Sequence, residues 1–183
     1  MTRYVALLRG INVGGKNLIK MTDLKACFEA LGLESVVTYI QSGNVLFSAD
    51  KGDQLKLTSR IESALSKTFN YQSRVVVRSQ KQMKDIVARA PEGFGNDPDT
   101  YRYHAIFLKE PMTAAEAMTS VSTKEGVDQA FAGKGVLYFS ILISRATQSH
   151  ISRIAGTPVY QSMTIRNWNT TTKLLNRMEM ISD

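Results

Sequence analysis

The sequence predicts an α+β fold built from two related halves with mainly antiparallel sheets. The first observation is the order of patterns over residues 3–78, where strand-like and helix-like segments follow each other as β-α-β-β-α-β. The second is that residues 101–143 begin the same order again. The third is a weak match between residues 42–48 and residues 133–140, which favours an internal duplication.

The first half is expected to contain four strands and two helices. Residues 3–8 form an apolar strand that ends where Arg9 opens a glycine-rich loop. Thr22 is expected to cap the first helix, and Gly32 to end it in the left-handed conformation. A hairpin follows, with strands at residues 36–40 and 45–48. An amphipathic helix at residues 54–69 and a last strand at residues 74–78 complete this half.

The second half is expected to begin after a linking helix capped by Ser79 and an acidic glycine–proline loop at residues 91–99. A strand is expected at residues 101–108, followed by a short helix at residues 113–121 that the Thr113–Glu116 capping box opens. A hairpin at residues 127–143 and a closing helix at residues 168–180 come next. This order predicts a tandem duplicated ferredoxin-like sandwich. The expected subdomains are residues 1–79 and residues 80–183, the second including the linking helix and the C-terminal helix.

The composition suits a globular protein and an anionic partner. Its 43% hydrophobic residues suffice for a core, and no run of about 18 apolar residues predicts a membrane helix. The net charge of +7 favours nucleic acid, nucleotides or acidic metabolites, although many proteins without such partners are equally basic. Cys27, the one cysteine, falls on an apolar helix face and suggests a core residue in a reducing cytosol.

The loop at residues 9–17 is the strongest candidate binding element. It combines three glycines with two asparagines, an arginine and a lysine directly after a strand. One interpretation is an anion cradle, in which backbone N–H groups and two cations hold a phosphate or carboxylate. The alternative is a turn whose backbone is satisfied by its own asparagines. The residues proposed to bind a ligand here are Arg9, Asn12, Gly14, Gly15, Lys16 and Asn17.

Residues 10–16 also satisfy the spacing of a nucleotide-binding P-loop, G-x-x-x-x-G-K. Asn17 replaces the serine or threonine that would hold magnesium, and the next helix does not start at once. The element order is also not the repeated β-α of nucleotide hydrolases. The sequence therefore argues against a P-loop enzyme.

Two further segments share this composition, and we hypothesise that all three line one cleft. In the predicted turn, amides and a hydroxyl at Gln41, Ser42 and Asn44 suit hydrogen bonds to a base edge or sugar, although a hairpin turn requires similar residues. At the start of the closing helix, an arginine, two amides and an indole suit an anion and a stacked base, although Asn167 also suits a helix cap. The residues proposed at the start of the closing helix are Arg166, Asn167, Trp168 and Asn169.

Catalytic signatures are sparse. His104 and His150 are far apart in sequence, and no cysteine, histidine or carboxylate cluster has the spacing of a metal site. No cofactor motif is recognised, and no catalytic residue is assigned. The RNP aromatic motif of RNA-recognition domains is absent from the first half, where only Phe47 lies on the third strand.

The sequence resembles one known family over essentially its whole length. The similar segments are residues 4–17, Met21 and Leu24, residues 38–45, and residues 164–170 followed by Lys173 and Leu174. They resemble the domain-of-unknown-function family 1697. The resemblance implies a duplicated ferredoxin-like architecture in a bacterial-type cytosolic protein, and it implies no activity.

The leading hypothesis is a cytosolic protein that binds an anionic ligand, either nucleic acid or a phosphorylated small molecule, in a cleft lined by the loop at residues 9–17. One alternative is an enzyme acting on a phosphate- or carboxylate-bearing substrate, with Arg9 stabilising charge. The other is a protein-interaction module whose motifs are purely structural.

Overall fold

The computed structural model describes residues 1–181 and divides into two compact units. The first unit comprises Met1–Met83 and the segment that begins at Leu174, and the second comprises Lys84–Lys173. The division therefore falls inside helix α3 (Gln80–Ala88) and inside helix α5 (Trp168–Met180). The subdomain boundary predicted between residues 79 and 80 lies at the start of α3, and it stays a prediction.

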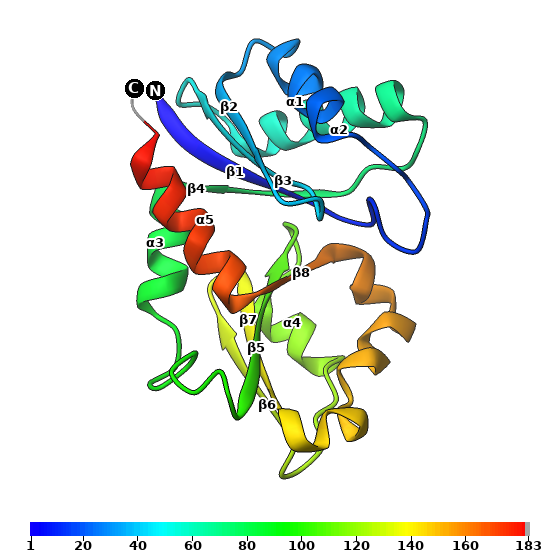
Figure 1. Cartoon of the computed structure of the whole chain (residues 1–183), viewed down its shortest axis with the longest axis vertical. Coiled ribbons are helices and arrows are strands. Elements are labelled where there is room, and N and C mark those ends of the chain that lie inside the picture. Colours follow the sequence, from blue (N-terminus) through cyan, green and yellow to red (C-terminus); the bar gives the residue numbers. More distant parts are fainter. Residues whose placement is uncertain (182–183) are drawn as a thin grey trace. The chain divides into compact units, whose positions relative to one another are not determined.

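The first unit is a four-stranded antiparallel sheet covered on one face by two helices (Figure 1). The strand order is β2-β3-β1-β4. The elements are β1 (Thr2–Leu8), α1 (Met21–Glu29), β2 (Glu34–Tyr39), β3 (Asn44–Ala49), α2 (Gln54–Phe69) and β4 (Val75–Ser79). Because side chains alternate along a strand, one face of β1 carries Tyr4, Ala6 and Leu8 into the core beside Phe28 of α1 and Leu65 of α2.

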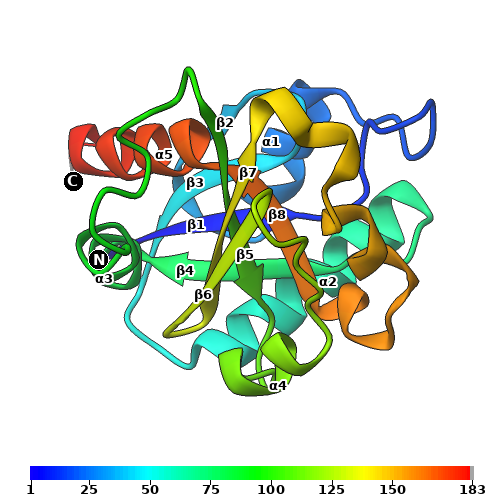
Figure 2. The ribbon, with the colours of Figure 1, turned by 90° about the horizontal axis from the view of Figure 1, so that it is seen from below.

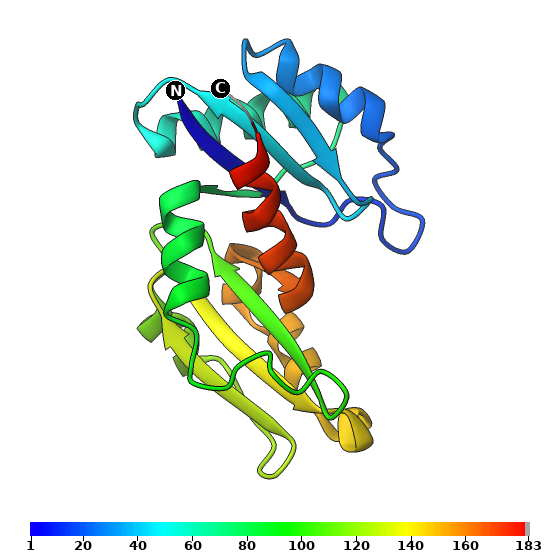
Figure 3. The ribbon, with the colours of Figure 1, turned by 60° about the vertical axis from the view of Figure 1, so that its left-hand side comes forward.

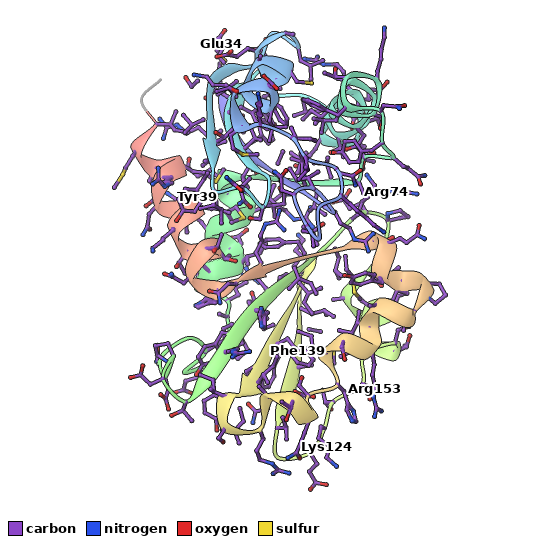
Figure 4. The ribbon with its side chains drawn as sticks, turned by 45° about the vertical axis from the view of Figure 1, so that its right-hand side comes forward. Glu34, Tyr39, Arg74, Lys124, Phe139 and Arg153 are labelled. Atoms are coloured by element: carbon purple, nitrogen blue, oxygen red, sulfur yellow. The ribbon has the colours of Figure 1, made fainter. Side chains whose placement is uncertain are left out.

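The second unit repeats this arrangement, with β5, β6 and β7 side by side in a sheet of order β6-β7-β5-β8 (Figure 2). Its elements are β5 (Tyr101–Leu108), α4 (Ala114–Thr119), β6 (Asp128–Gly133), β7 (Val136–Leu142), three 3₁₀ helices η1 (Ile143–Gln148), η2 (Ile151–Gly156) and η3 (Pro158–Ser162), and β8 (Met163–Asn167). Phe139, labelled in Figure 4, belongs to a core with Ala117 of α4 and Ile154 of η2.

The two sheets also match in detail. The N–H of Leu8 donates to Gly43 O at 2.8 Å, and the N–H of Leu108 donates to Gly135 O at 3.0 Å. Each is the last residue of the first strand in its sheet, and each acceptor directly precedes the third strand. These equivalent positions confirm the predicted fold class and indicate an internal duplication.

Two local expectations were wrong, and the elements of one segment were not predicted. Helix α1 begins at Met21 with Lys20 as N-cap, and no side chain caps it, so Thr22 lies inside the first turn. Strand β2 ends at Tyr39, because Ile40 takes a left-handed φ of 50° that stops the extended run. The segment before the closing helix contains 3₁₀ helices and β8, the strand that completes the second sheet.

Three other local predictions are confirmed and one is confirmed in part. Gly32 is left-handed at φ 72° as predicted, but the C-cap of α1 is Ala30, two residues earlier. Ser79 Oγ accepts from the N–H of Gln82, while Gln82 Oε1 accepts from the N–H of Ser79, which is a reciprocal cap for α3. Thr113 and Glu116 form the expected capping box. Cys27 is a buried free thiol in the first core.

Candidate functional site

The loop after β1 is fixed by the side chain of Asn12. Its Oδ1 accepts from the N–H of Ile19 at 2.8 Å, and its Nδ2 donates to Ile19 O at 3.1 Å and to Gln41 O at 2.9 Å. Asn12 itself has φ 52°, a conformation that asparagine tolerates better than most residues. The amide proposed to contact a ligand therefore holds the loop in shape and ties it to the turn before β3.

The glycine pair forms the tip of a tight hairpin. Val13 and Lys16 make an isolated antiparallel bridge, and the N–H of Lys16 donates to Val13 O at 3.1 Å. Gly14 and Gly15 have φ of 59° and 72°, the signs that a two-residue type I′ turn requires at both positions. Asn17 Nδ2 closes the base of the loop on Gly10 O at 2.8 Å. The loop is thus a small hairpin, which differs from the open phosphate cradle that its glycines also suit.

The turn before β3 packs directly against this loop. A Cβ added to Gly43, which has φ 85°, would lie 2.6 Å from Ile11 Cδ1, so only glycine allows this approach. Asn44 is fully buried, and its Nδ2 donates to Tyr39 O at 2.9 Å and to Ser42 Oγ at 3.1 Å. Of the three polar side chains predicted here, Gln41 is exposed and Ser42 half-buried, whereas Asn44 holds the turn together.

The surface formed by the loop and the end of the sheet is basic. The N–H of Arg9 donates to Arg74 O at 3.1 Å, so these two arginines begin side by side where β1 and β4 meet the loop. Arg74, labelled in Figure 4, and Arg9 are half-buried, while Lys16 and Lys20 are exposed. Residues 1–22 contain four basic and no acidic side chains, and residues 63–84 contain no acidic side chain either. We call these four residues, Arg9, Lys16, Lys20 and Arg74, the basic loop surface.

Two large apolar side chains interrupt this basic surface. Val13 is 65% exposed and Leu18 is 75% exposed, one on each side of the glycine turn. The loop therefore offers both positive charge and apolar contact area to a partner.

The predicted segment at the start of α5 belongs to the second unit. Arg166 is 8% exposed on β8, and it donates from Nη1 to Ile165 O at 3.0 Å. Desolvation by burial lowers the pKa of its guanidinium to about 10, which leaves it protonated at neutral pH. Asn167 Oδ1 accepts from the N–H of Asn169 at 2.8 Å, which confirms the helix cap. The shared cleft of all three segments stays a prediction.

Trp168 packs into an aromatic cluster of the second unit. Its ring lies 5.1 Å from that of Phe94 and 6.0 Å from that of Tyr138, both edge to face. A Cβ on Gly95 would clash with Trp168 Nε1, so the loop before β5 runs closely over the indole. Trp168 is half-buried, and this packing accounts for it without a stacked ligand.

Next to this cluster lies a hollow of about 190 Å³ that the sequence did not reveal. It is lined by four aromatic side chains, two polar side chains, a carboxylate and loop backbone, namely Phe94, Tyr101, Tyr103, Phe131, Gln129, Ser140, Glu92, Pro91 and Gly93. These residues come from a loop and three strands that are well separated in sequence. Only the register of the sheet brings them together.

A serine–histidine pair also lies in the second unit. Ser122 Oγ and His150 Nδ1 are 3.0 Å apart. Asp128 Oδ2 accepts from the backbone N–H of His150 at 2.8 Å, so this carboxylate fixes the chain and does not orient the imidazole ring. A catalytic triad requires the third group to orient the base. Within residues 1–181, no group of three or more histidine, cysteine or carboxylate side chains is arranged to hold a metal ion.

None of the helices in the described part of the chain is long and apolar enough to cross a membrane. No curated protein matches this sequence. The solved structure of the conserved bacterial protein SP0830 from Streptococcus pneumoniae is similar, with a TM-score of 0.84 at 25% identity, covering 97% of this chain and 98% of that one. The family model described as protein of unknown function, DUF1697, matches residues 1–138. The chain therefore belongs to the DUF1697 family.

Proposed function

We propose that this protein binds a phosphate-bearing ligand through the basic loop surface of its first unit. The observation that carries the proposal is the backbone hydrogen bond from Arg9 to Arg74, which places these two arginines side by side at the end of the sheet. The loop next to them leads to the exposed side chains of Lys16 and Lys20. These four cations lie in segments that carry no acidic side chain, and together they favour anions, although the carboxylate of Glu62 accepts from the N–H of Val75 next to Arg74.

Nucleic acid suits this surface better than a small phosphorylated metabolite. Lys16 is exposed on the small hairpin and Lys20 is exposed at the N-cap of α1, and two separated cations suit a spaced row of phosphates more than one enclosed phosphate. The apolar side chains of Val13 and Leu18 lie beside the cations and suit contact with sugars and bases. Arginine adds planar, two-pronged hydrogen bonding to phosphate oxygens.

The side chains proposed to touch the ligand are fewer than the sequence suggested. Asn12, Asn17 and Asn44 hydrogen-bond to the backbone of the loop and turn, so their role in binding is indirect. Gln41 and Ser42 stay in the proposal because the turn presents them next to the loop. We place this activity in a reducing, cytosolic compartment, because the single cysteine is buried and unpaired.

The test compares ligand classes in one assay. Fluorescence anisotropy with labelled single-stranded DNA, duplex DNA and single-stranded RNA is measured at low and moderate salt, with nucleoside triphosphates as competitors. The proposal expects oligonucleotide binding that weakens steeply with salt. Absence of binding to all three oligonucleotides at low salt would overturn it, and turnover of a phosphate ester would favour the enzyme alternative.

A further inference from the structure

We propose that the second unit binds an alkylated ammonium cation in the hollow lined by Phe94, Tyr101, Tyr103, Phe131 and Glu92, which we call the aromatic hollow. The proposal is independent of the basic loop surface, because every residue involved belongs to the second unit. The ligand proposed for the second unit is a cation, whereas the ligand proposed for the basic loop surface of the first unit is an anion.

The sheet places the aromatic rings on one face. Tyr103 pairs with Ser140 of β7, and Ser140 pairs with Gln129 of β6, so these three residues lie in one row across the sheet. Tyr101 and Phe131 each lie two residues from that row and therefore share its face. The other face of the sheet packs on α4 and the 3₁₀ helices, which leaves this face for the hollow.

The loop between α3 and β5 completes the hollow and is held in place. It runs alongside the strands of the second sheet in Figure 3. The ring of Phe94 meets that of Tyr103 edge to face at 4.9 Å, and it meets that of Tyr138 at 5.4 Å. The N–H of Phe94 donates to Pro91 O at 2.9 Å, so the loop closes on itself. The rings are therefore positioned before any ligand arrives, which lowers the entropic cost of binding.

The charge of the lining selects the sign of the ligand. Glu92 is the only charged residue in it, and residues 91–130 carry seven acidic and three basic side chains, a net −4 in a chain of net +7. Aromatic faces attract cations through their quadrupole, and recognition of quaternary and methylated ammonium groups by aromatic cages uses this attraction. A nucleotide would bring its phosphate close to Glu92, which disfavours base stacking here.

The size of the hollow fits such a group. Its volume of about 190 Å³ corresponds to roughly six water molecules at about 30 Å³ each. This space accepts a trimethylammonium head, with Gln129 and Ser140 at the wall for a polar substituent. Phe131 is 41% exposed, a large ring that a bound cation would partly cover.

The experiment follows amide and aromatic NMR shifts of the whole chain during titration with choline and, separately, with N-acetyl-trimethyllysine amide. Chemical-shift changes confined to the lining residues are expected with at least one of the two compounds. Stronger binding of choline would indicate a free small cation as the ligand, and stronger binding of the trimethyllysine compound would indicate a methylated protein side chain. The matched control ligand is 3,3-dimethyl-1-butanol, the uncharged carbon isostere of choline. Equal affinity for choline and the alcohol, or no binding of either cation, would overturn the proposal.

The variants Glu92→Gln and Phe131→Leu test the two sources of attraction separately. Both side chains are exposed, so both variants are expected to keep the wild-type amide spectrum outside the hollow. Each is expected to weaken cation binding by between about twofold and fivefold. Glu125→Gln removes an exposed carboxylate elsewhere in the second unit and is expected to leave the affinity unchanged. Unaltered affinity in both test variants would contradict the assignment.

Discussion

Asn12 Nδ2 donates to Gln41 O at 2.9 Å, and this contact joins the loop after β1 to the turn before β3. Residues 29 positions apart in sequence thereby act as one structural unit at the end of the first sheet. The same side chain also bonds both backbone groups of Ile19, so one asparagine fixes the entry and the exit of the loop. The shape of the proposed binding surface consequently depends on Asn12 even though this amide is engaged internally.

The first prediction concerns Asn12→Ala. The substitution removes three hydrogen bonds and places alanine at φ 52°, which alanine disfavours. We expect the free energy of unfolding to fall by about 2–3 kcal/mol, measured by urea denaturation. Asn12→Asp keeps the acceptor for the N–H of Ile19 and should fall between wild type and alanine. A change below about 0.5 kcal/mol for Asn12→Ala would contradict the assigned role.

The second prediction compares two glycines that both have positive φ. Gly43→Ala puts a methyl group 2.6 Å from Ile11 Cδ1 and 2.9 Å from Leu8 Cβ, whereas Gly14→Ala meets no atom within 4 Å. Both positions have positive φ, but only Gly14, at 59°, lies in the left-handed region that alanine can enter, so the difference combines the packing clash with backbone strain at Gly43, at 85°. We expect a loss of about 3 kcal/mol for Gly43→Ala and about 1 kcal/mol for Gly14→Ala. Similar losses in both variants would show that the turn does not pack on the loop as described.

The third prediction concerns Tyr138, whose hydroxyl donates to Ile86 O at 2.6 Å. Burial raises the pKa of the Tyr138 hydroxyl to about 12, although the positive charge of Arg89 acts in the opposite direction and lowers it. The folded chain therefore keeps a proton that the unfolded chain releases above pH 10.0, its unfolded pKa. This contribution to stability is complete below that pH and is lost as pH rises from 10 to about 12.

Denaturation at pH 8 and pH 11 tests this dependence. Tyr138→Phe should reduce the alkaline loss of stability relative to wild type. At pH 8 it should cost about 1–2 kcal/mol, because Ile86 O loses its donor. Equal alkaline losses in both proteins would rule out Tyr138 as the titrating group.

The sequence predicted the architecture well because hydrophobic periodicity marks most strands and helices directly. It missed β8 because this short edge strand, Met163–Asn167, alternates only two apolar residues with threonine, arginine and asparagine, which is too little apolar pattern to mark a strand. The duplication explains the exception. Arg166 is the fourth residue of β8 and Arg78 the fourth residue of β4, both are buried, and each donates to the carbonyl of the preceding residue. The internal repeat was thus a signal for β8 that periodicity could not supply.

The candidate sites were predictable to different degrees. The loop at residues 9–17 stood out because glycine, asparagine and cationic residues are concentrated in one short segment. Its internal hydrogen bonds were not predictable, because the partner of Asn12 lies on a distant turn. The aromatic hollow gave no local pattern at all. Tyr103 and Phe131 share a face only through the pairing of β5, β7 and β6.

The salt dependence of nucleic-acid binding tests the central claim most directly. The logarithm of the association constant for a labelled oligonucleotide is plotted against the logarithm of the salt concentration for wild type, Lys16→Ala, Arg74→Ala and Lys134→Ala. Lys134 is an exposed lysine in the β6–β7 turn of the second unit and serves as the matched control. We predict that Lys16→Ala and Arg74→Ala each reduce the slope by about 1 and that Lys134→Ala leaves it unchanged. A slope that is the same in all four proteins would contradict binding at the basic loop surface.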